Sequence, residues 1–275
     1  MKNKSFTLIE LLLVISIIGL LTLVIVSGLR SITDRARIAR TLQYQASLHR
    51  SIGNHLVGWW NFNEGTPGTC QGGADVCDIS GYNNHGTLIG TVLPQWVEGV
   101  PATEGQSLSF DGFSSGVLLE ETPLVFAGNL TISMWVFFND DSRGILFGSY
   151  NTANSVNIEK HTSHRLRINW NIGERDVFTL NNTTSENTWQ FVSFVRDKND
   201  NEFKFYLDGK EVHSVSGTGT DVTPVGPFRI GRDYRIGTTV TNGRIDDVRI
   251  YNTALTAEEI ERIYTETKHK YIAEY

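Results

Sequence analysis

Residues 243–264, GRIDDVRIYNTALTAEEIERIY, place a strand pattern and a helix pattern on either side of a short connection. The run 243–251 is rich in the β-branched and aromatic residues of a buried strand, whereas TAEEIERIY has helical spacing. Thr256 and Glu259 form the capping box that begins such a helix. Asp246 and Asp247 are adjacent on the strand, so we expect their side chains to point to opposite faces. This stretch predicts a strand followed by a helix.

Upstream, from residue 57 onward, short apolar or aromatic runs alternate with clusters of Gly, Asn, Asp and Thr. Such spacing is typical of an antiparallel sandwich or barrel. Asp208 and Gly209 have the composition of a two-residue hairpin turn. The stretch 57–265 is long enough for one all-β domain with a full core. The predicted strands lie in SLSFDG (107–112), TISMWVFF (131–138), GILFGS (144–149), LRINWNI (166–172), WQFVSFVRD (189–197) and FKFYLDGKEV (203–212).

The N-terminal segment has a different character. Residues 11–29 carry no charge and form an apolar run of membrane-spanning length. Lys2 and Lys4 precede this run, which favours a cytoplasmic N-terminus. An ordinary secretory signal is the alternative, but its apolar core would be shorter and uncharged. Glu10 lies inside the apolar segment, and a carboxylate there needs a cationic partner.

The string KSFTLIELLLVISIIGLL (4–21) resembles the class III signal of type IV pilins and pseudopilins. The resemblance implies that a prepilin peptidase cuts between Ser5 and Phe6 and that the new amine of Phe6 is methylated. It also implies that Glu10 pairs with the amine of a neighbouring subunit during filament assembly. One departure is Ser5, because the family almost always has Gly before the cut. Ser is also small, so we expect slower processing rather than none.

The resemblance divides the N-terminal part into a leader (1–5), a transmembrane or filament-core helix (6–29) and an amphipathic stem helix (30–56). Gly53 and Asn54 are plausible stop signals for the stem. The first 55 residues hold only two acidic residues, while the whole chain has a formal net charge of −6, so the part after the stem is acidic. Nucleic acid is therefore not expected as a partner of that part. The basic residues of the first 55 are Lys2, Lys4, Arg30, Arg35, Arg37, Arg40 and Arg50.

Across 57–265, the strings GWWNFNEG, DISGYNNHGTL, SLSFDG, LTISMWV and GRIDDVRIYNTALTAEEIERIY occur in an order that resembles laminin G-like, concanavalin A-like lectin/glucanase domains. The resemblance implies a jelly roll of two curved antiparallel sheets, followed by a C-terminal tail at 266–275. Domains of this kind bind glycans, bind proteins or act as spacers, so the fold alone does not define the function.

The same resemblance implies a structural calcium held by Asp78, Asn83 and either Asp246 or Asp247. Calcium prefers carboxylate, amide and carbonyl oxygens. The alternative is that Asp78 and Asn83 form Asx turns and that one of the paired aspartates bonds to backbone. Nearby, Cys70 and Cys77 lie in CQGGADVC, where export favours a disulfide.

Ligand recognition is expected from exposed aromatic side chains in loops that also carry polar residues. Trp135, Trp170 and Trp189 lie in strand-like runs and are expected in the core. Packing is the commoner role even for aromatic residues in loops. The candidates for stacking on a sugar are Tyr82, Trp96, Tyr150 and Tyr234.

Enzyme activity is not expected, because the sequence lacks the closely spaced catalytic carboxylates that glucanases of this fold class carry on one strand. The predicted function is that of a filament subunit, held in the cytoplasmic membrane before assembly, whose lectin-fold head serves surface adhesion through a glycan or a surface protein. The alternatives are a minor pseudopilin of a type II secretion system and a membrane-tethered carbohydrate-binding module that does not polymerise.

Overall fold

The computed structural model describes residues 8–9, 11–18, 52–98, 105–119, 128–149, 155–171, 175–222, 227–234 and 239–272. Ser5, Phe6, Glu10 and Tyr150 lie outside these residues, as does the stem before residue 52. The chain divides into two units, Met1–Ser51 and Ile52–Tyr275. In the first unit, residues 11–18 are helical. Of the helices in the described ranges, none combines the length and the apolar character needed to cross a membrane.

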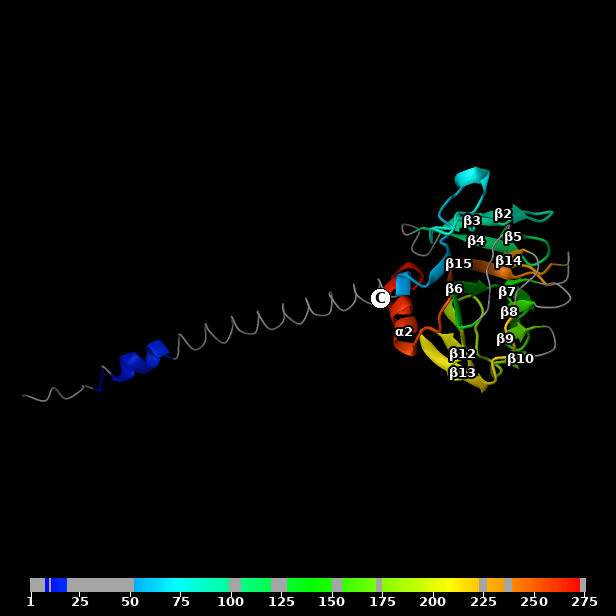
Figure 1. The fold of residues 1–275 in the computed structure, drawn as a ribbon. Helices are drawn as coiled ribbons and strands as arrows, with labels where there is room; N and C mark the ends of the chain where they lie inside the picture. The colour runs from blue at the N-terminus through cyan, green and yellow to red at the C-terminus, as the bar shows by residue number, and fades with distance from the viewer. Residues whose placement is uncertain are drawn as a thin grey trace, which may run out of the picture. The chain divides into compact units, whose positions relative to one another are not determined.

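The second unit is a sandwich of two antiparallel sheets (Figure 1). The eight-stranded sheet contains, in spatial order, β13 (Lys210–Ser216), β12 (Glu202–Leu207), β11 (Trp189–Asp197), β6 (Leu130–Phe138), β15 (Asn242–Tyr251), β4 (Gln106–Asp111) and β3 (Gln95–Glu98), with β1 (Leu56–Trp60) paired to β15. The seven-stranded sheet contains β10 (Arg175–Phe178), β9 (Arg165–Trp170), β8 (Val156–His161), β7 (Gly144–Ser149), β14 (Phe228–Ile230), β5 (Gly116–Leu119) and β2 (Gly86–Ile89). The all-β sandwich predicted from the sequence is confirmed.

The central strands are nearly continuous apolar runs because both faces of the eight-stranded sheet are covered. On β6, Ile132 and Met134 belong to the core between the sheets, whereas Trp135 belongs to a second cluster on the other face. On β11, Val192 and Phe191 divide in the same way. Alternation along a strand therefore supplies two separate hydrophobic layers. The predicted core positions of Trp135, Trp170 and Trp189 are confirmed, since all three are buried.

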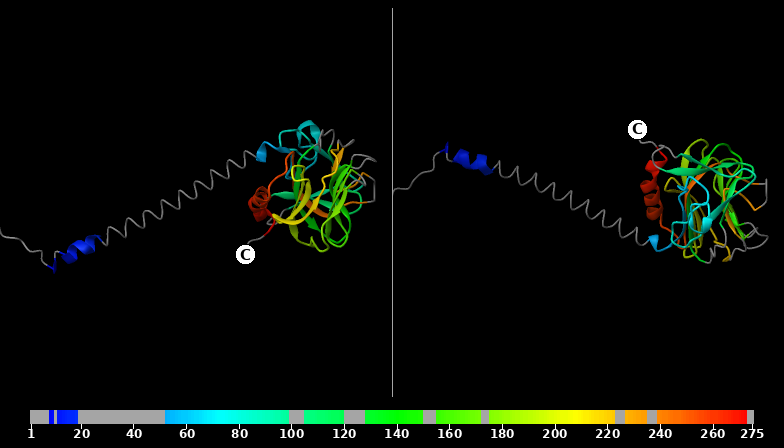
Figure 2. Two further views of the ribbon diagram at one scale, coloured as in Figure 1. Left: turned by 60° about the horizontal axis from the view of Figure 1, so that its bottom comes forward. Right: turned by 90° about the horizontal axis from the view of Figure 1, so that it is seen from above.

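The second cluster is covered by α2 (Ala257–Thr267), which lies along the outside of the eight-stranded sheet in both views of Figure 2. Thr256 accepts a hydrogen bond from the Glu259 backbone N–H, and the Glu259 side chain accepts one from the Thr256 backbone, so the predicted capping box is present. Ile260 and Ile263 are the buried apolar positions of the helix. Two short 3-10 helices, η1 (Gln71–Gly73) and η2 (Lys268–Lys270), complete the elements.

The ends of the head differ in part from the predicted boundaries. Helix ends at Gly53, where Gly53 and Asn54 were predicted as stop signals, although the stem segment was expected to reach residue 56; β1 begins at Leu56. Within the segment expected as a C-terminal tail, α2 continues to Thr267, and η2 and Tyr271 follow. Tyr271 is buried in the second cluster together with Ile52. Burial of this one aromatic ring therefore makes the C-terminal segment part of the packed domain.

The predicted hairpin at Asp208 and Gly209 is confirmed. Leu207 pairs with Lys210, and both turn residues have positive φ, as a type I′ turn requires. The Asp208 carboxylate accepts the backbone N–H of Phe191, which joins the turn to the neighbouring strand.

Asp246 and Asp247 do not alternate across the sheet as predicted. The pairing of β15 shifts register between Asp246 and Arg249, and Asp247 has a φ of 49°. This β-bulge puts both carboxylates on the side of the sheet that faces α2. There the Tyr271 hydroxyl donates to Asp246 Oδ2 at 2.7 Å, while Arg249 donates to Asp247.

Burial, together with the neighbouring Asp247, raises the pKa of Asp246 well above its usual value. The unfolded chain therefore releases this proton at a lower pH than the folded chain does. It follows that the contribution of Asp246 to stability falls as the pH rises above about 4, the ordinary aspartate pKa.

We expect Tyr271→Phe to lower the free energy of unfolding by roughly 1 to 3 kcal/mol at pH 7, because it leaves the buried Asp246 carboxylate without its hydroxyl donor. Tyr264→Phe is the matched control, since Tyr264 also stacks on Trp135 but its hydroxyl donates no hydrogen bond among the described residues. Urea unfolding of the two variants measures the difference. Equal stability would contradict the assigned role of the Tyr271 hydroxyl.

Candidate functional site

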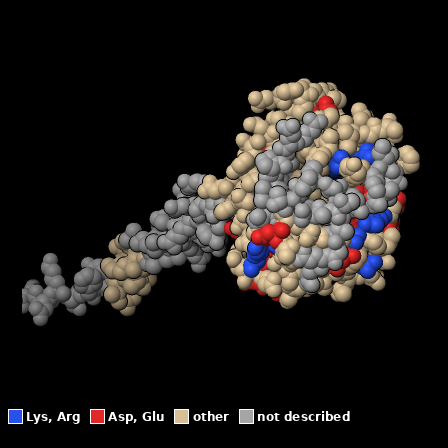
Figure 3. Space-filling model, turned by 45° about the vertical axis from the view of Figure 1, so that its right-hand side comes forward, with Lys and Arg blue, Asp and Glu red and all other residues tan. Residues whose placement is uncertain are grey.

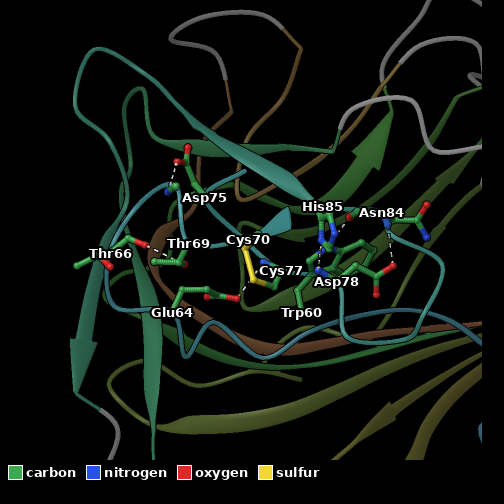
Figure 4. Close-up of a disulfide and its surroundings, with 11 residues drawn as sticks. Trp60, Glu64, Thr66, Thr69, Cys70, Asp75, Cys77, Asp78, Asn84 and His85 are labelled. Atoms are coloured by element: carbon green, nitrogen blue, oxygen red, sulfur yellow. Dashed lines mark hydrogen bonds between the residues drawn. A yellow bond between two sulfur atoms is a disulfide. The ribbon is translucent and has the colours of Figure 1, made fainter. Parts of the chain in front are cut away.

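The loop between β1 and β2 carries the residues predicted for the disulfide and for calcium (Figure 4). Cys70 and Cys77 form the predicted disulfide. The backbone N–H of Cys77 donates to Glu64 Oε1 at 2.9 Å, which fixes the second half-cystine to the start of the loop. The loop therefore has its own covalent and polar framework.

Asp78 is the centre of this framework. Its Oδ1 accepts the backbone N–H groups of Trp59 and Ser80, and its Oδ2 accepts that of Asn84, each at 2.9 Å. The Asn84 side chain in turn donates to the Val57 carbonyl. These contacts fasten the loop to β1. Asn83 is exposed, with a φ of 60°, a conformation that Asn tolerates in turns.

On the late strand, Asp247 bonds to the Trp59 indole Nε1 at 2.6 Å and to Arg249. Although burial alone would lower the pKa of Arg249, the Asp247 carboxylate raises it above the usual arginine value. Asp246 is occupied by the Tyr271 hydroxyl and by the Asp247 backbone N–H. The carboxylates predicted to coordinate calcium are therefore surrounded by a guanidinium and by several N–H or O–H donors.

The predicted donor set does not fit a calcium ion. Calcium needs several oxygens directed at one point, whereas the oxygens of Asp78, Asp246 and Asp247 are directed at hydrogen-bond donors. Within the described ranges, one group of at least three His, Cys, Asp or Glu residues has its ligand atoms close together: Glu64, Cys70 and Cys77. Both sulfur atoms of this group are in the disulfide. The arrangement agrees with the alternative of Asx turns and backbone bonds.

We expect the melting temperature of the full chain to be the same with calcium in millimolar excess and with EDTA, because the charges a cation would balance are already balanced by Arg249 and by N–H groups. Differential scanning calorimetry measures this. A calcium-dependent rise in melting temperature that is lost in Asp78→Asn would restore the predicted calcium site.

The predicted aromatic residues do not form one site. Tyr82 and Tyr234 are each 59% exposed, on different loops. Trp96 was expected in a loop, but it lies on β3, where it is half-buried and packs against the core. Strand pairing with β4 turns its ring toward the core, so Trp96 is not a binding residue of a loop. Of the predicted aromatic residues that the structure describes, Tyr82 and Tyr234 remain candidates.

A different set of residues forms a continuous row on the seven-stranded sheet. Their sequence neighbours, such as Phe228 and Ile230 or Val156 and Ile158, belong to the core, so the row lies on the outer face. The directly paired residues, from β2 to β10, are Thr87, Leu118, Arg229, Gly148, Asn157, Asn169 and Asp176. We call this set the cross-strand row. Figure 3 shows that basic and acidic side chains are interspersed on this side of the molecule.

The middle of the cross-strand row is polar, and at Gly148 no side chain rises above the sheet. A Cβ atom on Gly148 would come within 2.2 Å of the Asn157 side-chain oxygen, so only glycine fits beneath that amide. The side chains of Asn157 and Asn169 make no hydrogen bond within the described part of the chain, and they stand on adjacent paired positions. At about 4.8 Å per strand, the row from Arg229 to Asn169 spans roughly 14 Å. Asn157 is only 7% exposed and Asn169 is half-buried, so the two amides lie close to the sheet surface, over the length of a short oligosaccharide.

Arg229 ends this polar stretch. It is partly buried, its guanidinium carbon lies 5.1 Å from the centre of the Tyr234 ring, and its one hydrogen bond in the described residues is a 3.5 Å contact with the Pro227 carbonyl. Burial and then the charge of Arg232 lower the pKa of Arg229. Arg232 itself donates to the carbonyls of Ser114 and Asp233. Tyr234 is thus the predicted aromatic residue that the fold brings to a set of polar side chains.

Two residues along β8 and β9 from Asn157 and Asn169, the same face carries an ion-pair network. Glu159 is fully buried between Arg143 and Arg167, and Arg167 also donates to Asp176. Burial alone would lower the pKa of Arg167, but its bonds to Asp176 and Glu159 raise it. The network holds β8, β9 and β10 together and leaves no unpaired charge on these residues.

The sequence analysis did not identify the cross-strand row. Its members are scattered between residues 87 and 229, and they converge only through strand pairing. The available signal was the alternation of polar and apolar residues in the 156–161 and 165–170 runs. That pattern distinguishes the two faces of a strand, but it does not indicate which strands are neighbours.

Two family models match the chain. Residues 1–26 match the prokaryotic N-terminal methylation motif, in agreement with the predicted pilin-like signal. Residues 111–261, more than half of the chain, match the concanavalin A-like lectin/glucanases superfamily.

Solved structures share the fold of the head. Domain 4 of AbnA, a GH43 extracellular arabinanase from Geobacillus stearothermophilus, solved in complex with arabinotriose, has a TM-score of 0.58 and 17% identity over 76% of this chain and 98% of its own. The binding domain of botulinum neurotoxin DC, in complex with rat synaptotagmin II, has a TM-score of 0.59 and 13% identity over 78% of this chain and 52% of its own. The chain spans about half the length of such neurotoxin binding domains. At these identities the likeness shows the fold alone.

Proposed function

The chain belongs to the concanavalin A-like lectin/glucanases superfamily, and we propose from this that its head binds saccharides while its N-terminal segment builds it into a surface filament. The observation that supports the proposal is the presence of both matches in one chain. A methylation motif at residues 1–26 supplies an assembly signal, and the lectin-like sandwich supplies an outer face for binding.

In this proposal a prepilin peptidase removes residues 1–5, and the new N-terminus at Phe6 is methylated. The apolar helix 6–29 first lies in the cytoplasmic membrane and then in the filament core, continued by the stem from residue 30. The Glu10 carboxylate pairs with the amine of Phe6 in a neighbouring subunit. Neutralising each charge with the other removes the cost of placing either in an apolar environment.

We expect Glu10→Ala to yield a membrane-held, folded protein that forms no filaments, because the partner of Glu10 is in another subunit. Glu258→Ala is the matched control, since Glu258 is exposed on α2. Electron microscopy of sheared cell-surface material measures assembly, and mass spectrometry of the exported chain should give a methylated start at Phe6. Normal filaments from Glu10→Ala, or an exported chain that retains Met1, would contradict this part of the proposal.

The head is proposed to bind through the cross-strand row. The unfilled amides of Asn157 and Asn169 match the alternating donors and acceptors of sugar hydroxyls, and Tyr234 supplies an exposed aromatic face. The related arabinanase domain was solved with arabinotriose, which is in keeping with a saccharide on this fold. We further propose that the head is not an enzyme. On the described outer face, Glu159 and Asp176 are both paired with arginine and so are poorly placed to act as a general acid or base.

A shallow sheet surface buries little of its ligand, so one head is expected to bind with a dissociation constant in the micromolar to millimolar range, on the order of 10⁻⁶ to 10⁻³ M. Repetition along a filament raises the effective concentration of neighbouring heads. Avidity can then exceed the affinity of one site by roughly 10² to 10⁴. Weak single sites are therefore compatible with firm adhesion.

We expect Asn157→Ala and Asn169→Ala each to weaken saccharide binding by roughly two- to tenfold, the effect of one or two net hydrogen bonds. Asn199→Ala, in the turn between β11 and β12 of the other sheet, is the matched control. A glycan array identifies the ligand, and titration calorimetry of the full chain in detergent measures its affinity. Filaments that adhere to cells although no saccharide binds would instead indicate a protein partner.

A further inference from the structure

We propose that the saccharide bound by the cross-strand row carries a carboxylate, as a uronic acid does, and that Arg229 binds this carboxylate. This inference rests on the proposed saccharide-binding function and specifies the ligand class. It assigns the acidic group to the β14 end of the row and the neutral hydroxyls to the Asn157 and Asn169 end.

The first observation is the unmatched charge of Arg229. On the same outer face, Arg143 and Arg167 each bond to Glu159, and on the other sheet Arg249 bonds to Asp247. Arg229 has no carboxylate within 4 Å among the described residues. Its contacts are a long bond to a carbonyl and the Tyr234 ring. Burial and Arg232 lower the pKa of Arg229 by more than the nearby Asp233 carboxylate raises it. A partly buried guanidinium without an anion is a site that an external carboxylate can complete.

The second observation is the electrostatic state of the site. Burial disfavours the charged form of Arg229, and so does the nearby Arg232, with the result that the pKa is lowered. A bound carboxylate offsets the repulsion between Arg229 and Arg232 by adding a negative charge next to the two guanidinium groups. Folding has already removed part of the water around the Arg229 guanidinium, so binding has less desolvation to overcome. More of the energy of the guanidinium–carboxylate pair therefore contributes to ligand affinity.

The third observation is the shape of the row around Arg229. On one side stands Leu118, which offers no hydrogen bond, and on the other Gly148, which has no side chain. Beyond Gly148 lie the amides of Asn157 and Asn169. A ligand anchored at Arg229 meets Leu118 and then Thr87 in one direction, and the two amides across Gly148 in the other. Tyr234, stacked beside the guanidinium, is placed to meet the ring that bears the carboxylate.

General charge attraction does not account for such a preference. The chain has a formal net charge of −6, and this charge repels a polyanion at long range. Selection of an acidic saccharide must come from a local contact. Within the described outer face, Arg165 and Arg229 are both partly buried and have no carboxylate partner. Arg165 lies outside the cross-strand row and donates to the Thr162 carbonyl, whereas Arg229 is a member of the row. The preference for the acidic over the neutral saccharide should therefore persist at 0.15 M salt, where electrostatic interactions are screened beyond about 8 Å.

The experiment compares trigalacturonate with its fully methyl-esterified form, which keeps the sugar backbone and replaces each carboxylate by a neutral methyl ester, by titration calorimetry on the full chain in detergent at 0.15 M salt. A glucuronate and glucose trisaccharide pair extends the test to a second sugar backbone. We expect the acidic member of at least one pair to bind about tenfold more tightly, the equivalent of about 1.4 kcal/mol. Arg229→Gln should remove this preference, so that the acidic member binds no more tightly than the neutral one.

Arg229→Lys should retain part of the preference, because it keeps the charge and loses the bidentate geometry. Lys210→Gln, which removes one exposed positive charge from β13 on the other sheet, is the control and should behave as the unsubstituted chain. Thermal melting verifies that each variant is folded.

Equal binding of acidic and neutral forms, or a preference that persists in Arg229→Gln, overturns this inference and leaves the saccharide-binding function in place. If neither member of either pair binds and a glycan array is also blank, the proposed saccharide function fails together with the inference. Loss of the preference in Lys210→Gln would show that overall charge, and not Arg229, is responsible.

Discussion

The fold depends on the β-bulge at Asp246 and Asp247 in β15. One edge of β15 pairs with β6 along most of its length, whereas the other edge is divided between β4 at Asn242–Ile245 and β1 at Val248–Tyr251. The bulge lies where the second edge passes from one partner to the other. Without the extra residue, β1 and β4 would have to form one continuous ladder, and the two carboxylates would face opposite sides. The bulge instead directs them to Tyr271 and Trp59, which joins the first strand and the C-terminal segment to the centre of the sheet.

This arrangement determines where a ligand can bind. The inner faces of both sheets form the core, and α2 with Tyr271 covers the outside of the eight-stranded sheet. The outer face of the seven-stranded sheet is covered by no helix or strand of the described ranges. Polar side chains placed there stabilise the fold only where they pair, as Glu159 and Arg167 do. Arg229, Asn157 and Asn169 form no such ion pair within the described residues, and in the proposed function they contact the saccharide.

The sequence predicted those features that depend on neighbouring residues. The hairpin at Asp208 and Gly209 and the capping box at Thr256 follow from local backbone chemistry, and Cys70 and Cys77 are only seven residues apart. The features that it did not predict depend on distant pairing. Arg229 and Gly148 become neighbours only because β14 inserts between β5 and β7. The bulge likewise reverses the expected orientation of Asp247, which periodicity alone cannot indicate.

In the proposed filament, the strand connectivity places the attachment of the stem and the proposed saccharide site on different sheets. Ile52, at the end of the stem, is buried in the cluster that contains Tyr271, and the His55 ring bonds to the Asn252 side chain. Tension on the stem would therefore enter the head through Ile52, β1 and the pairing of β1 with β15. β1 and β15 belong to the eight-stranded sheet, and Ile52 packs in the cluster on its outer face. The cross-strand row lies on the other sheet, and within the described ranges no strand of one sheet pairs with a strand of the other. In the proposed filament, tension would strain the sheet next to the stem while the strands of the cross-strand row keep their register, which weak, repeated contacts require.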